Sequence, residues 1–254
     1  MKKGILPFTI LFFLVVFFAA CKKNNDTAPA APQKTMLSKA DYSAVGTYTY
    51  TYDNSNKLLA EMYSGNASNP SAVTTFTNFD GRGRVTEFLT DYGPATYTDY
   101  KTVVSYNSDG KVERKQTYDL SGNNAGYNYF QYTTGKITVK QYSASNAVSF
   151  STEYTFSVDG LNIITSKSFN SAGTLTSTTN YSNFDAKHST DSLLPYGYID
   201  IPFNKNNWQS LSRTNNLSGT VTAFTVAYDY NADDYPVKRT ASSGSTIAYD
   251  YLKK

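Results

Sequence analysis

The sequence predicts an all-β fold, an antiparallel up-and-down meander of about twelve strands that closes, or nearly closes, into a barrel. Two observations carry this prediction. An aromatic-led turn motif recurs at a nearly fixed spacing, and between the turns the side chains alternate with a period of two. The connections are too short for parallel crossovers, so neighbouring strands are expected to run antiparallel.

The chain begins with a segment typical of a secretory leader. Two lysines precede an apolar run from Ile5 to Ala20, and this run is shorter than the roughly 20 residues that span a bilayer. Residues 1–20 are therefore predicted to be a signal helix that is cleaved off. Cys21 follows directly, and because it is the only cysteine in the chain, no intramolecular disulfide can form.

The residues around Cys21, Phe18-Ala19-Ala20-Cys21, resemble the lipobox of bacterial lipoproteins. The resemblance implies cleavage between Ala20 and Cys21 and attachment of lipid to the cysteine sulfur. Bacterial lipoproteins carry two or three acyl chains, which suffice for stable attachment. We therefore expect a protein anchored by lipid to the outer membrane, facing either the periplasm or the cell exterior.

The segment after the anchor is predicted to be a disordered tether covering residues 21–45, because it is polar and contains two prolines. Without the leader, Lys and Arg number 21 against 20 acidic residues, so the mature chain is close to neutral. A nucleic-acid partner would need clustered positive charge, and none is expected. The membrane, reached through the lipid, is the expected partner.

The repeat begins after the tether, and residues 46–254 are predicted to form a single domain. Each copy has a Tyr or Phe, then Asp or Asn with small polar residues, then Lys, Arg or an aliphatic residue that opens the next strand. The first five leading aromatics lie 27, 27, 26 and 24 residues apart. Each period also contains a second aromatic-led turn, so one repeat is one hairpin. The leading aromatics are Tyr52, Phe79, Tyr106, Tyr132, Phe156 and, later, Tyr230.

Strands are indicated between the turns, where Tyr48 and Tyr50 interleave with Thr47 and Thr49. The alternation places aromatic side chains on one face and Ser, Thr, Lys and Glu on the other. Pairing of the strand near Tyr48 with the last one, near Tyr249, would remove the two exposed edges of an open sheet. Closure into a barrel is therefore favoured, with the aromatics inside.

The turn motif resembles the tyrosine-aspartate (YD) repeats of Rhs-type proteins. The chain as a whole is similar to a group of Bacteroidota lipoproteins of unknown function whose domain is described as having a porin-like fold. The string Asn204-Lys205-Asn206-Asn207 and the string Asp234-Tyr235-Pro236-Val237-Lys238 match the closing segment of that group, although Trp208 stands where proline is usual. The resemblance implies the fold and brings no activity with it.

A transmembrane pore is not expected in spite of the porin-like description. Spanning barrels require a continuous apolar band facing lipid. The strand from Lys111 to Thr117 carries charged side chains on both of its faces. Neither face suits lipid, so the barrel is predicted to stand in water.

Catalytic chemistry is poorly supported by the composition. A single histidine, His188, and a cysteine committed to lipid cannot form a His/Cys metal centre, so no metal, no cofactor and no enzymatic activity are expected. A glycoside hydrolase would need only two acids, but the acids lie mainly in turns. The turns Asn107-Ser108-Asp109-Gly110 and Asn231-Ala232-Asp233-Asp234 have calcium-loop spacing without completing an EF-hand, and ordinary hairpin turns are favoured for them.

The repeat breaks between about Asp185 and Trp208, and long irregular connections often carry function. An aromatic cluster there could stack a sugar ring or gate the barrel mouth, or Trp208 could simply plug one end. The candidate binding residues are His188, Asp191, Tyr196, Tyr198 and Trp208.

The predicted function is that of a non-enzymatic β-scaffold in the cell envelope, which binds a glycan, a peptide or a protein through its loops or its barrel mouth. One alternative is a purely structural or assembly role beside another envelope protein. A less favoured one is glycoside hydrolysis by carboxylates.

Overall fold

The computed structural model of this chain describes residues 33–43, 45–65, 71–93, 98–194 and 204–254. One compact unit extends from Lys34 to Lys254. The predicted signal helix, the lipidation site Cys21 and most of the predicted tether lie outside the described residues. No helix in the described ranges is long and apolar enough to cross a bilayer.

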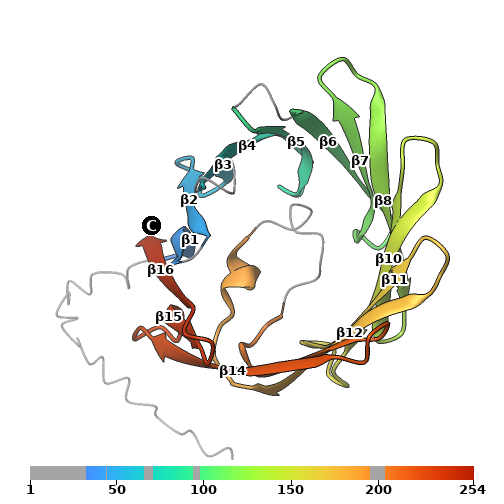
Figure 1. The fold of residues 1–254 in the computed structure, drawn as a ribbon. Helices are drawn as coiled ribbons and strands as arrows, with labels where there is room; N and C mark the ends of the chain where they lie inside the picture. The colour runs from blue at the N-terminus through green and yellow to red at the C-terminus, as the bar shows by residue number, and fades with distance from the viewer. Residues whose placement is uncertain (1–32, 44, 66–70, 94–97, 195–203) are drawn as a thin grey trace, which may run out of the picture. The chain divides into compact units, whose positions relative to one another are not determined.

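The described residues form sixteen antiparallel strands that close into one barrel, each strand pairing with its neighbours in the sequence and β1 pairing with β16 (Figure 1). The strands are β1 (Thr35–Tyr42), β2 (Gly46–Tyr52), β3 (Leu58–Ser64), β4 (Ala72–Phe79), β5 (Val85–Asp91), β6 (Tyr100–Tyr106), β7 (Val112–Asp119), β8 (Asn124–Thr133), β9 (Lys136–Tyr142), β10 (Val148–Phe156), β11 (Ile163–Asn170), β12 (Leu175–Phe184), β13 (Trp208–Asn215), β14 (Val221–Tyr230), β15 (Pro236–Ala241) and β16 (Thr246–Lys253). A short 3-10 helix, η1 (Thr190–Leu193), lies between β12 and β13.

The closed all-β barrel is confirmed, with sixteen strands where the turn motifs predicted about twelve. Two of the additional strands flank a turn that starts at Phe184-Asp185 and is interrupted by an insertion. Another is β1, which lies in the stretch assigned to the tether. It is β1, with Ala40 opposite Tyr249, and not the predicted strand near Tyr48 (β2), that closes the barrel against β16. Met36, Leu37 and Ala40 of β1 are buried, so the folded domain begins at Lys34 and not at residue 46.

The two ends of the barrel differ in their turns. The turns after β2, β4, β6, β8, β10, β12 and β14 lie at the same end as both termini of the folded unit, because the strands alternate in direction. We call it the termini end and the opposite one the far end. All six motifs recognised in the sequence are turns of the termini end.

Asp80 illustrates the chemistry of these turns. Its Oδ1 accepts hydrogen bonds from the backbone N–H groups of Arg82 and Arg84, both at 2.9 Å. Gly83 has a φ of +75° and donates its N–H to the Asp80 carbonyl. A turn closed by a left-handed residue requires Gly, Asn or Asp at that position. The equivalent residues are Asn56, Gly110, Gly160 and Asp234, all with positive φ.

Consecutive repeats contact each other through the same residues that define the motif. The Tyr106 hydroxyl donates to the carbonyl of Val85 at 2.6 Å, and the Arg84 guanidinium lies 3.9 Å from the centroid of the Tyr106 ring. The equivalent cation–π contacts join Lys57 to Phe79 and Lys111 to Tyr132, and the equivalent hydroxyl bonds join Tyr52 to Leu37 and Tyr132 to Val112. The aromatic and the basic residue thus recur because each fastens one hairpin to the next.

The inside of the barrel, its lumen, has two unlike walls. The apolar core lies on β1 to β9 and β16, where side chains such as Phe76, Phe88 and Phe130 are buried. On β10 to β14 many of the inward positions carry small hydroxyl side chains, and these alternate with larger ones such as Tyr181 and Phe224. The strand pairing shows which positions face inward. Val139 of β9 packs on the core and lies opposite Thr152 of β10, so Thr152 and the residues opposite it on the following strands face inward as well. These residues, which we call the hydroxyl wall, are Thr152, Ser166, Ser168, Ser177, Thr179 and Thr222.

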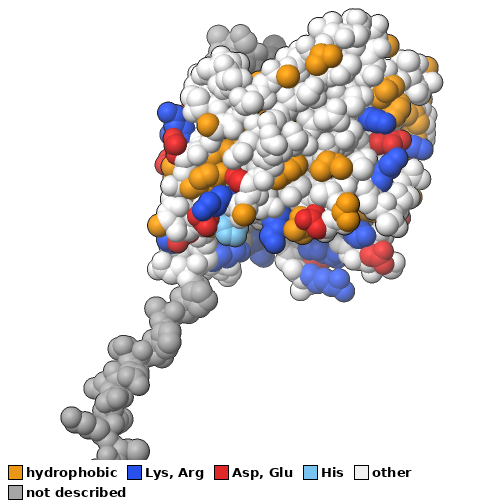
Figure 2. Space-filling view, turned by 90° about the horizontal axis from the view of Figure 1, so that it is seen from below, with side chains coloured by type: hydrophobic (Ala, Val, Ile, Leu, Met, Phe, Trp, Pro, Cys, Tyr) orange, Lys and Arg blue, Asp and Glu red, His pale blue; other side chains and the backbone are white. Residues whose placement is uncertain are grey.

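The buried aromatic side chains are therefore concentrated on the first wall, whereas the aromatic side chains of the second wall, such as Tyr181 and Phe224, stay partly exposed. The outer face carries ion pairs between strand residues, among them Glu153 with Lys136 at 2.8 Å and Glu87 with Lys101 at 3.9 Å. Figure 2 shows one side of the barrel, on which charges of both signs are interspersed among polar side chains and the hydrophobic side chains form separate small patches.

The substitution Tyr52→Phe tests the ties between hairpins. It removes the 2.7 Å bond to the Leu37 carbonyl, and burial, which raises the pKa of Tyr52 to about 12, shows how little water could replace that bond. We expect the free energy of unfolding to fall by about 1 kcal/mol, measured by urea denaturation. The control is Tyr118→Phe, since the Tyr118 ring lies on the outer face under Lys101. Equal losses in both variants would contradict the assignment.

Candidate functional site

The interrupted turn after β12 is a seventh copy of the motif with an insertion spliced into it. Asp185 Oδ1 accepts from the backbone N–H of Lys187 at 2.9 Å, as Asp80 does from the residue two positions on. Asp80 accepts its second hydrogen bond from the residue four positions on. Asp185 accepts its second one from the N–H of Asn207, 22 positions on, at 3.1 Å. The N–H of Asp185 in turn donates to the Asn207 carbonyl at 3.0 Å. The turn chemistry is preserved across the insertion.

Asparagine side chains clamp the two ends of the insertion together. Asn207 Nδ2 donates to the carbonyl of His188 at 2.9 Å, and Asn206 Nδ2 donates to the carbonyl of Lys187 at 3.1 Å. Asn204 Oδ1 accepts from the N–H of Ile163, the first residue of β11, at 2.7 Å. The Asn-rich string that the sequence shows before Trp208 is thus the neck that holds the insertion to the barrel.

The described part of the insertion enters the lumen, where Figure 1 shows η1 inside the ring of strands. Ser189 caps η1, since its Oγ accepts from the N–H of Asp191. Leu193 and Leu194 then pack against the apolar core on the opposite wall. The described part of the insertion therefore adds two leucine side chains to the packed wall.

Asp191 stands in this enclosed space among tyrosines. Its side chain keeps surface accessible to water. Desolvation by the surrounding protein nevertheless raises the pKa of its carboxyl, and the charge of Arg239 opposes the rise. Burial, followed by the Asp191 charge, raises the pKa of Tyr42. Burial also raises the pKa of Tyr249, and that of Tyr228 to about 12. The carboxylates of Asp191 and Glu61, the guanidinium of Arg239 and these three phenols thus interact electrostatically inside the barrel.

Trp208 opens β13 at the edge of the same space. Its ring lies 5.7 Å from that of Tyr181 and 6.0 Å from that of Phe224, both in edge-on geometry. The guanidinium of Arg239 lies 4.6 Å from the Trp208 ring centroid. All three rings remain partly exposed, which is the condition for a further aromatic or sugar ring to stack on them.

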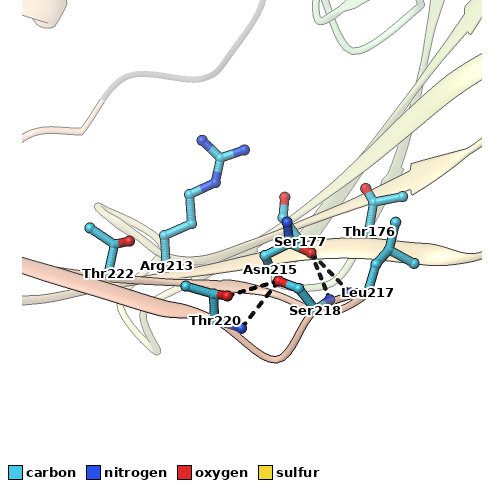
Figure 3. A pocket seen from close by; sticks show the side chains of 8 residues that line it. All are labelled: Thr176, Ser177, Arg213, Asn215, Leu217, Ser218, Thr220 and Thr222. Carbon is cyan, nitrogen blue, oxygen red and sulfur yellow. Dashed lines mark hydrogen bonds between the residues drawn. The ribbon is translucent and has the colours of Figure 1, made fainter.

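The far-end mouth of the hydroxyl wall holds a cavity of about 490 Å³. Arg213 extends from β13 into it, and Figure 3 shows this side chain reaching further from the sheet than any other labelled one. The cavity is lined by Thr176, Ser177, Arg213, Asn215, Leu217, Ser218, Thr220 and Thr222. Polar groups on a concave surface, with one cation among them, suit a hydroxylated or anionic ligand.

Of the predicted site residues, Asp191 and Trp208 come together at the lumen. His188 lies at the neck, with its ring stacked 4.6 Å from that of Tyr235. Tyr196 and Tyr198 lie outside the described residues. Sequence reasoning missed Arg239, Arg213 and the hydroxyl wall. Alternation in Leu211-Ser212-Arg213 was the available signal for Arg213.

Metal ligation finds no support among the residues that the structure describes, which contain no group of three or more His, Cys, Asp or Glu side chains suited to a metal ion. In the two turns with calcium-loop spacing, Asn107 Oδ1 and Asn231 Oδ1 each accept two backbone N–H groups. These oxygens act as turn caps, as the hairpin interpretation predicts.

Comparison with known proteins supports the fold. A crystal structure of a porin-like protein from Bacteroides vulgatus ATCC 8482 aligns with a TM-score of 0.54 and 12% sequence identity, over 85% of this chain and 99% of that one. Another, of a porin-like protein from Bacteroides uniformis ATCC 8492, aligns with a TM-score of 0.43 and 12% identity over 85% of this chain and 98% of that one. No protein-family model and no curated protein sequence matches the chain. The likeness to the first structure is one of fold, and the expected porin-like fold is confirmed.

The variant Asp191→Asn tests the electrostatics of the lumen. A carboxyl whose pKa is raised on folding binds its proton more tightly in the folded state. Asp191 therefore does not destabilise the fold below its ordinary pKa of 3.8, where it is protonated in both states, and destabilises it fully above the raised pKa, where it is ionised in both. We expect Asp191→Asn to be more stable than the wild type at pH 7 and equal to it at pH 3, measured by urea unfolding. The variant Asp109→Asn, at an exposed turn tip, is the control. A variant that is less stable at pH 7 would show that attraction to Arg239 outweighs enclosure.

Proposed function

We propose that this protein is a lipid-anchored protein of the cell envelope that binds a glycan inside its barrel, along the hydroxyl wall, and leaves it chemically unchanged. The observation that carries the proposal is the asymmetry of the lumen. Apolar side chains pack the side formed by β1 to β9 and β16, with Leu193 and Leu194 against them, while small hydroxyl groups occupy many inward positions on β10 to β14.

The chemistry of the wall supports a sugar ligand. Ser and Thr hydroxyls both donate and accept hydrogen bonds, which matches the hydroxyls of a sugar. The Trp208 cluster at one end supplies aromatic surface for the apolar faces of sugar rings. A row of inward hydroxyl groups with aromatic rings beside it suits an oligosaccharide.

Lipid attachment at Cys21 supports a place at the membrane. The leader ends directly before Cys21, and the folded domain starts at Lys34. A linker of that length spans at most roughly 40 Å when fully extended, at about 3.3 Å per residue. The barrel would therefore stay within a few nanometres of the bilayer, with its mouths available to ligands in the adjoining compartment.

Trp208 is the only tryptophan in the chain, so intrinsic fluorescence reports directly on the proposed site. We expect a saturable change in emission when oligosaccharides of four to six units are added, and unchanged oligosaccharide by mass spectrometry afterwards. Calorimetry should show loss of binding in Trp208→Ala and retention in Tyr118→Ala, whose ring lies on the outer face. Shortened products would favour hydrolysis instead. Asp191 and Glu61, whose charges both act on Tyr42, are the acids to substitute in that case.

The anchor is tested separately by Cys21→Ala in the native host. We expect the variant to keep its leader and to lose its acyl chains, both read from the intact mass, because the thiol that accepts the lipid is gone. A wild-type protein whose mature mass shows no acyl group would contradict the anchor. That outcome would leave the glycan site untouched.

A further inference from the structure

We infer that the luminal site takes an anionic oligosaccharide, one whose sugar units carry carboxylate groups, and that Arg213 and Arg239 bind those groups. This inference rests on the proposed function and names the class of glycan. The two guanidinium groups lie on β13, within the strands of the hydroxyl wall, and on β15, the strand beside them.

Arg213 is the more accessible of the two. It stands in the far-end cavity beside Ser177 and Thr222, and its side chain is exposed. Within the ranges that the structure describes, no carboxylate forms an ion pair with it. Arg84, by contrast, forms an ion pair with Asp80 at 2.5 Å. An unpaired guanidinium in a concave site can bind a carboxylate through two parallel hydrogen bonds.

Arg239 provides the second cation. Its guanidinium lies over the ring of Trp208, and it too forms no ion pair with a carboxylate of the described residues. The acid that interacts electrostatically with Arg239 is Asp191 on η1. The wall that joins Arg213 to Arg239 thus carries two positive charges and no carboxylate of its own.

The spacing of the two arginines sets the size of the ligand. Arg213 lies opposite Thr222 of β14, and Arg239 lies opposite Tyr228 of the same strand. Six residues of strand at about 3.3 Å each separate the two positions by roughly 20 Å. A monosaccharide cannot reach both, whereas an acidic oligosaccharide of several units can. Phe224 and Tyr181, between the two charges, offer ring surface to the intervening sugars.

An extended acidic peptide is the competing ligand, and the topology disfavours it. Extended peptides bind most readily by adding a strand to a free sheet edge. The barrel is closed, with both ladders of every strand occupied, so no such edge faces the lumen. A glycan makes no demand on backbone groups and uses the side-chain hydroxyls that are present.

The test compares a tetrasaccharide of galacturonic acid with the neutral galactose tetrasaccharide of the same linkage, on the full mature protein in detergent, by Trp208 fluorescence and calorimetry. We expect the acidic ligand to bind at least tenfold more tightly at low salt, with the advantage shrinking as salt rises. Arg213→Ala should weaken acidic binding roughly tenfold to a hundredfold and leave neutral binding unchanged. Arg213→Lys, which keeps the charge and loses the fork, should fall between. Arg82→Ala, at a turn of the termini end, is the matched control.

Equal affinity for the two tetrasaccharides, or no effect of Arg213→Ala on acidic binding with the thermal midpoint unchanged, would overturn the inference and leave the proposed function standing. Binding of tetraglutamate as tight as that of the acidic sugar would overturn it in favour of a peptide. If neither tetrasaccharide nor any oligosaccharide binds, the proposed function fails and this inference fails with it.

Discussion

The pairing of β1 with β16 is the constraint on which the rest of the structure depends. It joins the first and last strands of the folded unit from Thr35 opposite Lys253 to Tyr42 opposite Ile247. Without it the meander would be an open sheet with two rows of unpaired backbone groups and one uncovered face. Closure creates the lumen, in which one wall buries aromatic side chains and the other carries many inward hydroxyl groups.

Around the ring, a single local device is repeated. An Asp or Asn caps a tight turn, a Gly, Asn or Asp takes the left-handed position, and the basic residue that follows lies against the next leading aromatic. Because the device depends on so few bonds, it tolerates an insertion between them. Asp185 keeps both of its bonds although the second partner is Asn207. A segment can therefore enter the lumen without disturbing the barrel.

The sequence predicted the parts of the fold that this device controls. Turns such as Phe79-Asp80 carry the capping side chain, and the strands beside them alternate clearly between apolar and polar side chains. The hairpins and their spacing could therefore be predicted from the sequence. The sequence did not reveal β1, because no capping Asp or Asn of the kind seen at Asp185 marks it. The partner of β1, β16, also lies at the other end of the chain. The sequence did not reveal the hydroxyl wall either. In β12, Ser and Thr occupy both faces, and alternation without contrast does not show which face is inside.

The candidate site was predicted in part for the same reason. Trp208 and Asp191 stood out because the repeat breaks around them, whereas Arg213 lies inside an ordinary strand and gains meaning only once the sheet is closed. The central claim is therefore closure, and a disulfide tests it most directly. Partners across antiparallel strands have Cα atoms about 4.5 to 5.5 Å apart, within the range that a disulfide bridges.

Cysteines introduced at Lys39 and Asp250, partners across the closing ladder, in a chain carrying Cys21→Ser, have only each other to bond. A second chain with cysteines at Thr240 and Thr246, partners in the β15–β16 hairpin, forms its bond whether or not the barrel closes. We predict that both pairs oxidise to intramolecular disulfides in the folded monomer and that urea suppresses the first. Free thiols at positions 39 and 250 beside a formed bond at positions 240 and 246 would contradict closure.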